Sequence, residues 1–203
     1  MAARSRPRPT SRDIRWAPAR GKVLAAVITA AAVALAAALL IRGAASTVRT
    51  ASDAACLALR PNPLSASLRA LIPDFELPDL KGNKVSLRSL RGKPVLVSFF
   101  ATWCPPCVEE APTLEVLASR IGAKAQVMVV SVDEDFDALK KFYAKGSAAT
   151  VVRDESKNVP TSFGTSKYPE SFLIDPSGKV RYAFINQRDW SVPEAAACVL
   201  GLR

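Results

Sequence analysis

Apolar and polar residues follow different patterns in successive parts of this chain. Residues 23–41 form an uninterrupted apolar run in which Thr29 is the one residue with a polar side chain. Such a run is apolar on every face of a helix, whereas a helix that covers a water-soluble core is apolar on one side. As a helix these 19 residues would extend about 28 Å, close to the roughly 30 Å of a bilayer's hydrocarbon core. We expect residues 23–41 to be a transmembrane helix.

From Asp74 onward, short apolar runs alternate with segments of helical periodicity. The expected strands are 75–77, 84–87, 94–101, 125–132, 149–152, 171–174 and 179–184, and the expected helices are 105–121, 135–145 and 192–200. Asp175-Pro-Ser-Gly178 has the residue types of a turn and joins the last two strands into a hairpin. This order predicts an α/β domain over residues 74–203.

Residues 42–73 read as a spacer between these two parts. They are rich in alanine, serine and arginine, contain three prolines and lack aromatic residues. A helix somewhere between Thr47 and Leu59 is compatible with this composition. We expect compact folding to begin at Asp74.

The positive charge is concentrated at the N-terminus. The net charge is +10, and residues 1–22 carry seven basic residues and one acidic residue, a local +6. This excess sits in a tail rather than on the folded domain, so we expect no nucleic-acid partner. Basic residues before a transmembrane helix favour a cytoplasmic N-terminus, which leaves the chain after Ile41 outside the cytoplasm.

There are two alternatives to an uncleaved anchor, a cleavable signal peptide and a lipid anchor, and the sequence disfavours the lipid anchor more. The apolar region of a signal peptide usually has about 7–15 residues, shorter than this run. Cleavage near Ala45 nevertheless stays open. Lipid attachment at Cys56 is disfavoured, because Asp53-Ala-Ala-Cys56 lacks an apolar residue ahead of its small pair and lies far from the run.

The segment Thr102-Trp-Cys-Pro-Pro-Cys-Val-Glu-Glu-Ala-Pro112 lies between an expected buried strand and an expected helix. This position places Cys104 at the helix N-terminus and Cys107 three residues later on the same face. Free N–H groups and the helix dipole favour a thiolate at Cys104. The pair therefore predicts dithiol–disulfide exchange.

Other uses of a C-x-x-C pair fit the chain poorly. A closed zinc site needs four Cys or His ligands, whereas this chain has no histidine and only two further cysteines. Attachment of c-type haem needs a histidine after the second cysteine, where Val108 stands. We expect no cofactor beyond the Cys104–Cys107 disulfide, and no metal.

Pro105 and Pro106 fit the first helical turn, where an N–H group would lack an intrahelical partner. They also remove two donors that could have stabilised the thiolate. We therefore expect a more reducing pair than one with donor-bearing residues between the cysteines.

Several motifs together resemble the thioredoxin superfamily, and within it the TlpA/ResA-like membrane-anchored thiol–disulfide oxidoreductases. The resemblance covers residues 73–203 and implies a thioredoxin-like fold, a central mixed sheet flanked by helices. The motifs are Pro73-Asp-Phe-Glu-Leu77, Gly92-Lys-Pro-Val-Leu-Val97, Ala101-Thr-Trp-Cys-Pro-Pro-Cys107, Glu110-Ala-Pro112 and Tyr168-Pro-Glu-Ser-Phe-Leu-Ile-Asp175.

The resemblance assigns roles to individual residues. Together with the helix geometry it implies that Cys104 is the nucleophile and Cys107 the resolving thiol. Cytosolic thioredoxins carry a buried aspartate at the position of Ser98, whereas the TlpA/ResA-like proteins place a glutamate at the position of Glu110. Glu110 is then the expected proton-handling group near Cys107. The alternative is a solvated carboxylate on the helix.

Three further residues are expected to bind the substrate. By resemblance, Pro169 is a cis-proline whose loop faces the dithiol and offers backbone groups to an extended client chain. Tyr168 precedes it and would influence partner choice, although it is bulkier than the small residue of close relatives. Trp103 is expected to pack beside the cysteines and to shape the docking surface.

The other two cysteines are expected to stay outside the mechanism. Cys198 lies on a short apolar helix, where a buried thiol acts as a small hydrophobe. Cys56 lies in the spacer. A disulfide between the two is the alternative that an oxidising compartment allows.

These expectations favour a reductant of protein disulfides on the outer, periplasmic side of the cytoplasmic membrane, with apocytochrome c or metal-site thiols among the candidate clients. A membrane electron donor would re-reduce it. An oxidant or isomerase is the first alternative, and a thiol chaperone for copper is disfavoured by the lack of histidine and of a methionine-rich stretch. Peroxidase chemistry would need a Thr-x-x-Cys spacing, which Thr102-Trp-Cys104 does not have.

Overall fold

The computed structural model describes residues 19–65 and 74–202, and the chain divides into two compact units, Met1–Ala45 and Ser46–Arg203. The expected basic tail, residues 1–22, lies almost entirely outside the described residues. In the first unit, helix α1 (Ala19–Ala58) begins, and its segment Val27–Ala44 has a mean hydropathy of 2.1 with its side chains exposed. This segment is long and apolar enough to cross a membrane. It overlaps the expected span over residues 23–41.

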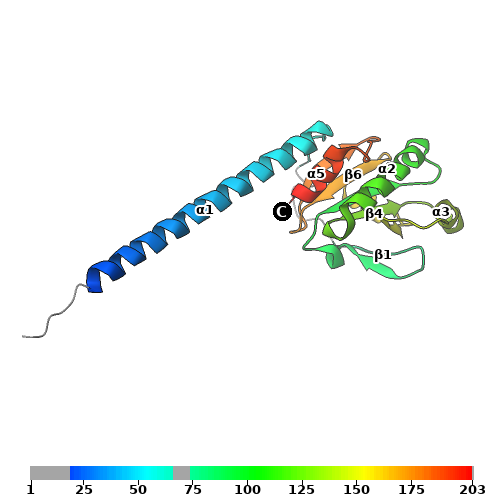
Figure 1. The fold of residues 1–203 in the computed structure, drawn as a ribbon. Coiled ribbons are helices and arrows are strands. Elements are labelled where there is room, and N and C mark those ends of the chain that lie inside the picture. Colours follow the sequence, from blue (N-terminus) through cyan, green and yellow to red (C-terminus); the bar gives the residue numbers. More distant parts are fainter. Residues whose placement is uncertain (1–18, 66–73, 203) are drawn as a thin grey trace, which may run out of the picture. The chain divides into compact units, whose positions relative to one another are not determined.

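The second unit has the predicted α/β architecture (Figure 1). Its strands are β1 (Glu76–Pro78), β2 (Lys84–Ser86), β3 (Val95–Phe100), β4 (Gln126–Ser131), β5 (Thr150–Arg153), β6 (Glu170–Ile174) and β7 (Val180–Ile185). Its helices after α1 are α2 (Pro105–Ile121), α3 (Phe136–Phe142), α4 (Asn158–Ser162) and α5 (Pro193–Gly201), with 3-10 turns η2 (Leu87–Leu90) and η3 (Gly122–Lys124).

Five strands form one mixed sheet in the order β5-β4-β3-β6-β7. Strands β3, β4 and β5 are parallel, and β6 and β7 are antiparallel to their neighbours. The predicted hairpin is therefore the pair β6–β7, at one edge of the sheet. Strands β1 and β2 form a separate two-stranded sheet.

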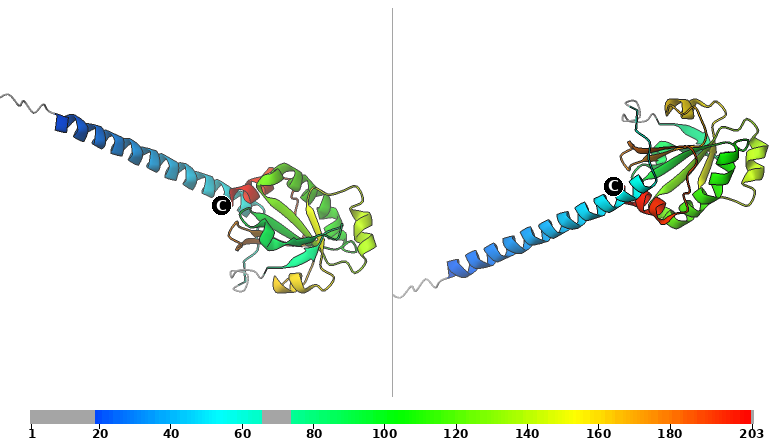
Figure 2. Two further views of the ribbon diagram at one scale, coloured as in Figure 1. Left: turned by 90° about the horizontal axis from the view of Figure 1, so that it is seen from below. Right: turned by 90° about the horizontal axis from the view of Figure 1, so that it is seen from above.

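Alternation along β3 divides the core into two layers. Leu96 and Phe100 face the cluster that contains the buried residues of α2, α3 and α5, whereas Val97 and Phe99 face the cluster under α4 and the β1–β2 pair. Figure 2 shows α2 and α5 on one side of the sheet and α4 on the other. Because β3 is buried on both faces, it reads as a continuous apolar run, as expected of a central strand.

Apart from helix α3, the bounds of the elements expected after Asp74 lie within one residue of the observed ones. Helix α3 ends at Phe142, three residues before the expected end at Lys145. Helix α4 was not expected, and its five residues are too few for a periodic pattern to be recognised.

The expected spacer differs most from the structure. Helix α1 continues through residue 58, and residues 46–65 belong to the same compact unit as the catalytic domain. Asn62 donates its N–H to Ala183 on β7 at 2.7 Å, and its side-chain oxygen accepts the N–H of Ile185 at 2.8 Å. Compact packing therefore begins well before Asp74.

Cys56 and Cys198 form a disulfide between the last turns of α1 and helix α5. Both residues are completely buried. The expectation that Cys198 is a free buried hydrophobe is therefore wrong, and the disulfide left as an alternative is present. The pairing was not evident in the sequence because 142 residues separate the two cysteines.

Replacing this disulfide should lower the stability of the domain. A bridge that closes so long a loop stabilises by about 2–5 kcal/mol, largely by restricting the unfolded chain in the entropic account. We expect Cys56→Ala/Cys198→Ala to lower the free energy of unfolding by that amount, measured by urea denaturation of the full-length protein in detergent. The matched control is Cys104→Ala/Cys107→Ala, which opens a bridge spanning three positions. Equal urea midpoints for wild type and the Cys56/Cys198 variant would contradict the prediction.

Candidate active site

The dithiol lies at the junction that the sequence predicted. Strand β3 ends at Phe100, and α2 begins at Pro105 with Cys104 in the N-cap position. Cys104 and Cys107 are joined by a disulfide, so the structure shows the oxidised form. Cys104 is 6% exposed and Cys107 is 1% exposed. The more accessible sulfur is thus the one at the helix N-terminus.

Backbone hydrogen bonds at the start of α2 are directed away from the sulfur of Cys104. Pro105 and Pro106 contribute no N–H, and the next two donors, Cys107 and Val108, both bond the carbonyl oxygen of Cys104 at 3.0 and 3.1 Å. The helix therefore stabilises a thiolate at Cys104 mainly through its dipole rather than through direct backbone donors.

Asp133 anchors the loop before the dithiol. Its carboxylate accepts the backbone N–H of Thr102 at 3.0 and 3.1 Å and the Thr102 hydroxyl at 2.6 Å. Asp133 is 1% exposed, and Ser131 donates a further bond to it. Asp133 was missed in the sequence, although its place directly after a buried strand at the carboxyl edge of a parallel pair was an available clue.

Glu110 is buried in the interior rather than solvated. Its residue is 1% exposed, on the face of α2 that carries Cys107. Oxygen Oε1 accepts the backbone N–H of Arg188 at 2.9 Å and the indole N–H of Trp190 at 2.8 Å. Burial raises the pKa of Glu110 from 4.5 to about 7, against the opposing effect of these two donors and of the Arg188 charge. A carboxyl group with this pKa can take up and release a proton near neutral pH.

Ser98 occupies the sheet position below the active-site helix. It is buried, pairs with Ser171 across the β3–β6 ladder, and neither hydroxyl has a hydrogen-bond partner among the described residues. Ser98 carries no carboxylate and cannot accept a proton from the dithiol. Glu110, which lies on the same helix as Cys107, is the buried acid available for this role.

The loop before β6 brings Tyr168 and Pro169 to the third expected substrate-binding residue, Trp103, which precedes Cys104. The Tyr168–Pro169 peptide bond is cis, as the resemblance implied. Glu170, the first residue of β6, pairs with Phe99 near the end of β3, which places Pro169 next to the strand that leads to Cys104. Trp103 is 60% exposed, and its ring contacts that of Tyr168 edge-on with centroids 6.1 Å apart. Two aromatic rings thus border the dithiol.

Comparison with known proteins agrees with this geometry. Residues 68–183 match the model of the AhpC/TSA family. The chain belongs to this family. It is also 34% identical over 118 residues to the thiol-disulfide oxidoreductase ResA of Bacillus anthracis, a match that covers 57% of this chain and 68% of the relative.

Solved structures show the same fold. The thioredoxin domain of a thiol-disulfide oxidoreductase from Bacteroides vulgatus aligns with a TM-score of 0.53 at 29% identity, over 61% of this chain and 91% of that one. A protein described as the thiol:disulfide interchange protein DsbE of Chlorobium tepidum aligns with a TM-score of 0.57 at 32% identity, over 62% and 89%. The predicted thioredoxin-like fold is confirmed, and this AhpC/TSA-family protein is a thiol-disulfide oxidoreductase.

Another buried acid lies at the start of β6. Glu170 follows Pro169 and is buried, and burial is the main cause that raises its pKa. The sequence pattern did not predict a buried acid at this position. Its position after the cis bond places this acid beside the Tyr168–Pro169 loop.

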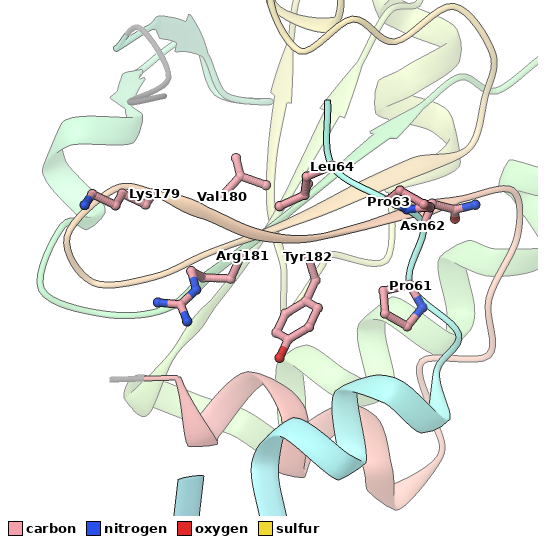
Figure 3. A pocket seen from close by; sticks show the side chains of 8 residues that line it. All are labelled: Pro61, Asn62, Pro63, Leu64, Lys179, Val180, Arg181 and Tyr182. Atoms are coloured by element: carbon pink, nitrogen blue, oxygen red, sulfur yellow. The ribbon is translucent and has the colours of Figure 1, made fainter. Parts of the chain in front are cut away.

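The open groove in Figure 3 lies beside β7, away from the dithiol. It is lined by residues 61–64 and 179–182, and Val180 and Leu64 lie on the opposite side of β7 from Arg181 and Tyr182. Val180 pairs with Ile174, at the end of β6 far from Pro169. This groove is therefore not part of the dithiol site. Among the described residues, no cluster of three or more His, Cys, Asp or Glu side chains could hold a metal ion.

The burial of Glu110 predicts a pH-dependent stability. A folded-state pKa of about 7 against an ordinary 4.5 means that the folded protein prefers the neutral acid. That contribution is complete below pH 4.5 and is lost as the pH rises through about 7. We expect wild type to lose roughly 3 kcal/mol relative to Glu110→Gln over this interval, measured by denaturant unfolding at a series of pH values. The amide can still accept both hydrogen bonds, so packing is conserved.

Glu109→Gln, which removes the neighbouring exposed carboxylate, is the matched control. A constant difference between wild type and Glu110→Gln across the pH series would show that the carboxyl group is not perturbed by burial.

Proposed function

We propose that this thiol-disulfide oxidoreductase reduces disulfides of client proteins outside the cytoplasmic membrane. The observation that carries the proposal is the Cys104–Cys107 pair at the start of α2, where the first free backbone N–H groups bond the carbonyl oxygen of Cys104 rather than its sulfur. The buried Glu110 lies one helical turn after Cys107. A poorly stabilised thiolate favours the disulfide form of the enzyme and hence reduction of the client.

The reaction proceeds in two exchanges. The Cys104 thiolate attacks one sulfur of the client disulfide, which forms a mixed disulfide and releases the other client sulfur as a thiolate. Cys107 then gives its proton to the carboxylate of Glu110 and attacks the Cys104 sulfur, which releases the second client thiolate. Two electrons pass to the client, two protons complete its thiols, and the enzyme is left with the Cys104–Cys107 disulfide.

A membrane electron donor must restore the dithiol. This donor and the client each approach the same sulfur of Cys104, because Cys107 is 1% exposed. Trp103, Tyr168 and Pro169 border that approach and form the proposed client-binding surface. Clients of the cytochrome c maturation type are proposed from the resemblance to ResA.

Two features support a location on the extracytoplasmic side. The segment Val27–Ala44 can span a membrane and follows the basic residues 1–22, so the positive-inside rule leaves the domain outside. The buried Cys56–Cys198 disulfide suits an oxidising compartment. We propose residues 1–22 as a cytoplasmic tail, residues 23–41 as the anchor, and the chain after Ile41 as the extracytoplasmic part.

Peroxidase chemistry is less compatible with the site. The Thr102 hydroxyl donates its hydrogen bond to the carboxylate of Asp133 at 2.6 Å. The hydroxyl therefore fixes the loop and is not free to donate to a peroxide. An oxidant differs from the proposed reductant in the direction of electron flow, whereas an isomerase would pass no net electrons to its client.

Trapping of mixed disulfides tests the reaction and its direction. In cells that express the full-length Cys107→Ser variant, we expect Cys104 to hold client proteins in mixed disulfides that resist exchange, identified by mass spectrometry. Cys104→Ser is the control and should trap none. In wild-type cells quenched with acid, the dithiol should be mostly reduced. A wild-type dithiol found mostly as the disulfide would favour the oxidant instead.

The aromatic surface should matter for proteins more than for small disulfides. An exposed aromatic contact is worth about 0.5–1.5 kcal/mol, so Trp103→Ala and Tyr168→Ala should each lower kcat/KM for a protein disulfide by about 3- to 10-fold. Rates with oxidised glutathione should change little. Val116→Ala, which truncates an exposed apolar residue further along α2, is the control. Equal losses with both substrates would indicate a structural effect rather than client binding.

A further inference from the structure

Arg188 connects the end of helix α1 to the carboxylate of Glu110. It lies in the loop between β7 and α5 and is half-buried. Its backbone N–H donates to Oε1 of Glu110 at 2.9 Å. Its guanidinium group donates to the carbonyl oxygens of Leu59 at 3.1 Å and Arg60 at 3.2 Å. One residue therefore bonds both the candidate proton acceptor and the juxtamembrane segment.

The carbonyl groups of Leu59 and Arg60 directly follow the last turn of α1. The helix ends at Ala58, and Leu59 donates its N–H back to Cys56 in a closing turn. Carbonyl groups at a helix C-terminus lack intrahelical donors and carry the negative end of the helix dipole. The cationic fork of Arg188 satisfies two carbonyls at this end, a geometry that a planar guanidinium group provides and a lysine does not.

The same turn is fixed covalently to the domain. Cys56 lies three residues before Leu59, and its disulfide with Cys198 joins this turn to α5. Both cysteines are completely buried. The carbonyl groups that receive Arg188 are thus held in place by the disulfide.

The loop that carries Arg188 is also bonded to α2. The Trp190 indole donates to Oε1 of Glu110, and the Trp190 N–H donates to the hydroxyl of Thr113 at 3.1 Å. Gln187 contacts the carboxylate of Glu109 at 3.3 Å. Since both donors to Glu110 reach the same oxygen, they orient its Oε2 as the site where a proton is gained or lost.

We propose that Arg188 is a positioning residue for Glu110 and that the juxtamembrane turn, held by the Cys56–Cys198 disulfide, supports it. The inference rests on the proton-handling role proposed above for Glu110. The segment that leads to the anchor is then part of the machinery that prepares the resolving thiol, rather than a passive tether. Breaking the Cys56–Cys198 disulfide would loosen the turn. It would thereby weaken proton transfer at Cys107, although neither Cys56 nor Cys198 takes part in the exchange reaction.

The sign of the effect follows from the groups that face the carboxylate. These are the Arg188 charge and N–H and the Trp190 indole, while Cys107 lies one turn earlier on the same face of α2. The Arg188 and Trp190 groups lower the pKa of Glu110 against the effect of burial. Their displacement disfavours the carboxylate and moves its titration to higher pH.

The test measures the rate of disulfide exchange against pH for the full-length protein in detergent, with oxidised glutathione as the disulfide. The reduced Cys104–Cys107 pair is prepared with the Cys56–Cys198 bridge intact, verified by mass spectrometry. We expect Arg188→Gln to move the inflection due to Glu110 to higher pH by about one unit, which is a tenfold lower ionised fraction on its acidic side. Arg188→Lys, which keeps the charge but not the fork, should shift it less. Cys56→Ala/Cys198→Ala should shift it in the same direction.

Arg181→Gln is the matched control, because Arg181 is an exposed arginine on β7 that bonds Asp175 instead. The same substitutions are then made in the Glu110→Gln background, where Arg188→Gln should cause no further change. Circular dichroism of each variant verifies the fold, and Arg188→Lys serves if Arg188→Gln does not fold.

The outcomes separate the two proposals. If Glu110→Gln removes the inflection but neither Arg188 variant moves it, Glu110 handles the proton and the positioning role of Arg188 is overturned. If Glu110→Gln leaves the profile unchanged, the proton-handling role fails and the inference falls with it. An equal effect of Arg188→Gln with and without Glu110 would show that Arg188 acts on stability alone, which also overturns the inference.

Discussion

The burial of one carboxyl group between helix α2 and the loop after β7 is the constraint on which the site depends. Glu110 is 1% exposed, and placing an ionisable group there is unfavourable unless its oxygens are hydrogen-bonded. The indole of Trp190 and the N–H of Arg188 supply these bonds from residues 80 and 78 positions away. The loop must therefore fold against α2 in one arrangement, and this arrangement brings the C-terminal part of the domain to the dithiol.

The sheet provides the rigid base for this arrangement. Strand β3 lies at the centre of five strands and is buried on both faces, so its end is held on each side by β4 and β6. Asp133, which follows β4, bonds the loop before Cys104, and the Pro169 loop leads into β6. Functional residues thus come from the ends of neighbouring strands, as in other α/β folds where sites lie at the carboxyl edge of parallel strands.

The described residues divide the cysteines between two tasks. Cys104 and Cys107 are three positions apart and form the candidate redox pair, whereas Cys56 and Cys198 are 142 positions apart and hold the end of α1 to α5. A thiol-disulfide oxidoreductase with a structural disulfide must keep that bridge out of reach of its own thiols. Complete burial of Cys56 and Cys198 provides this separation, because exchange requires access to the sulfur.

Local patterns in the sequence determined the apolar span, the order of the strands and of all helices except the short α4, and the placement of Cys104 and Cys107 at a helix start. Each of these follows from periodicity or spacing within a few residues, where chain geometry alone decides which side chains share a face. The cis bond at Pro169 was inferred only by resemblance, since the local sequence does not distinguish it. Tertiary structure alone decided that Cys56 meets Cys198, that Asp133 holds Thr102, and that Glu110 is buried against Trp190. These contacts join segments 31 to 142 residues apart. They depend on how whole elements pack, which no local pattern encodes.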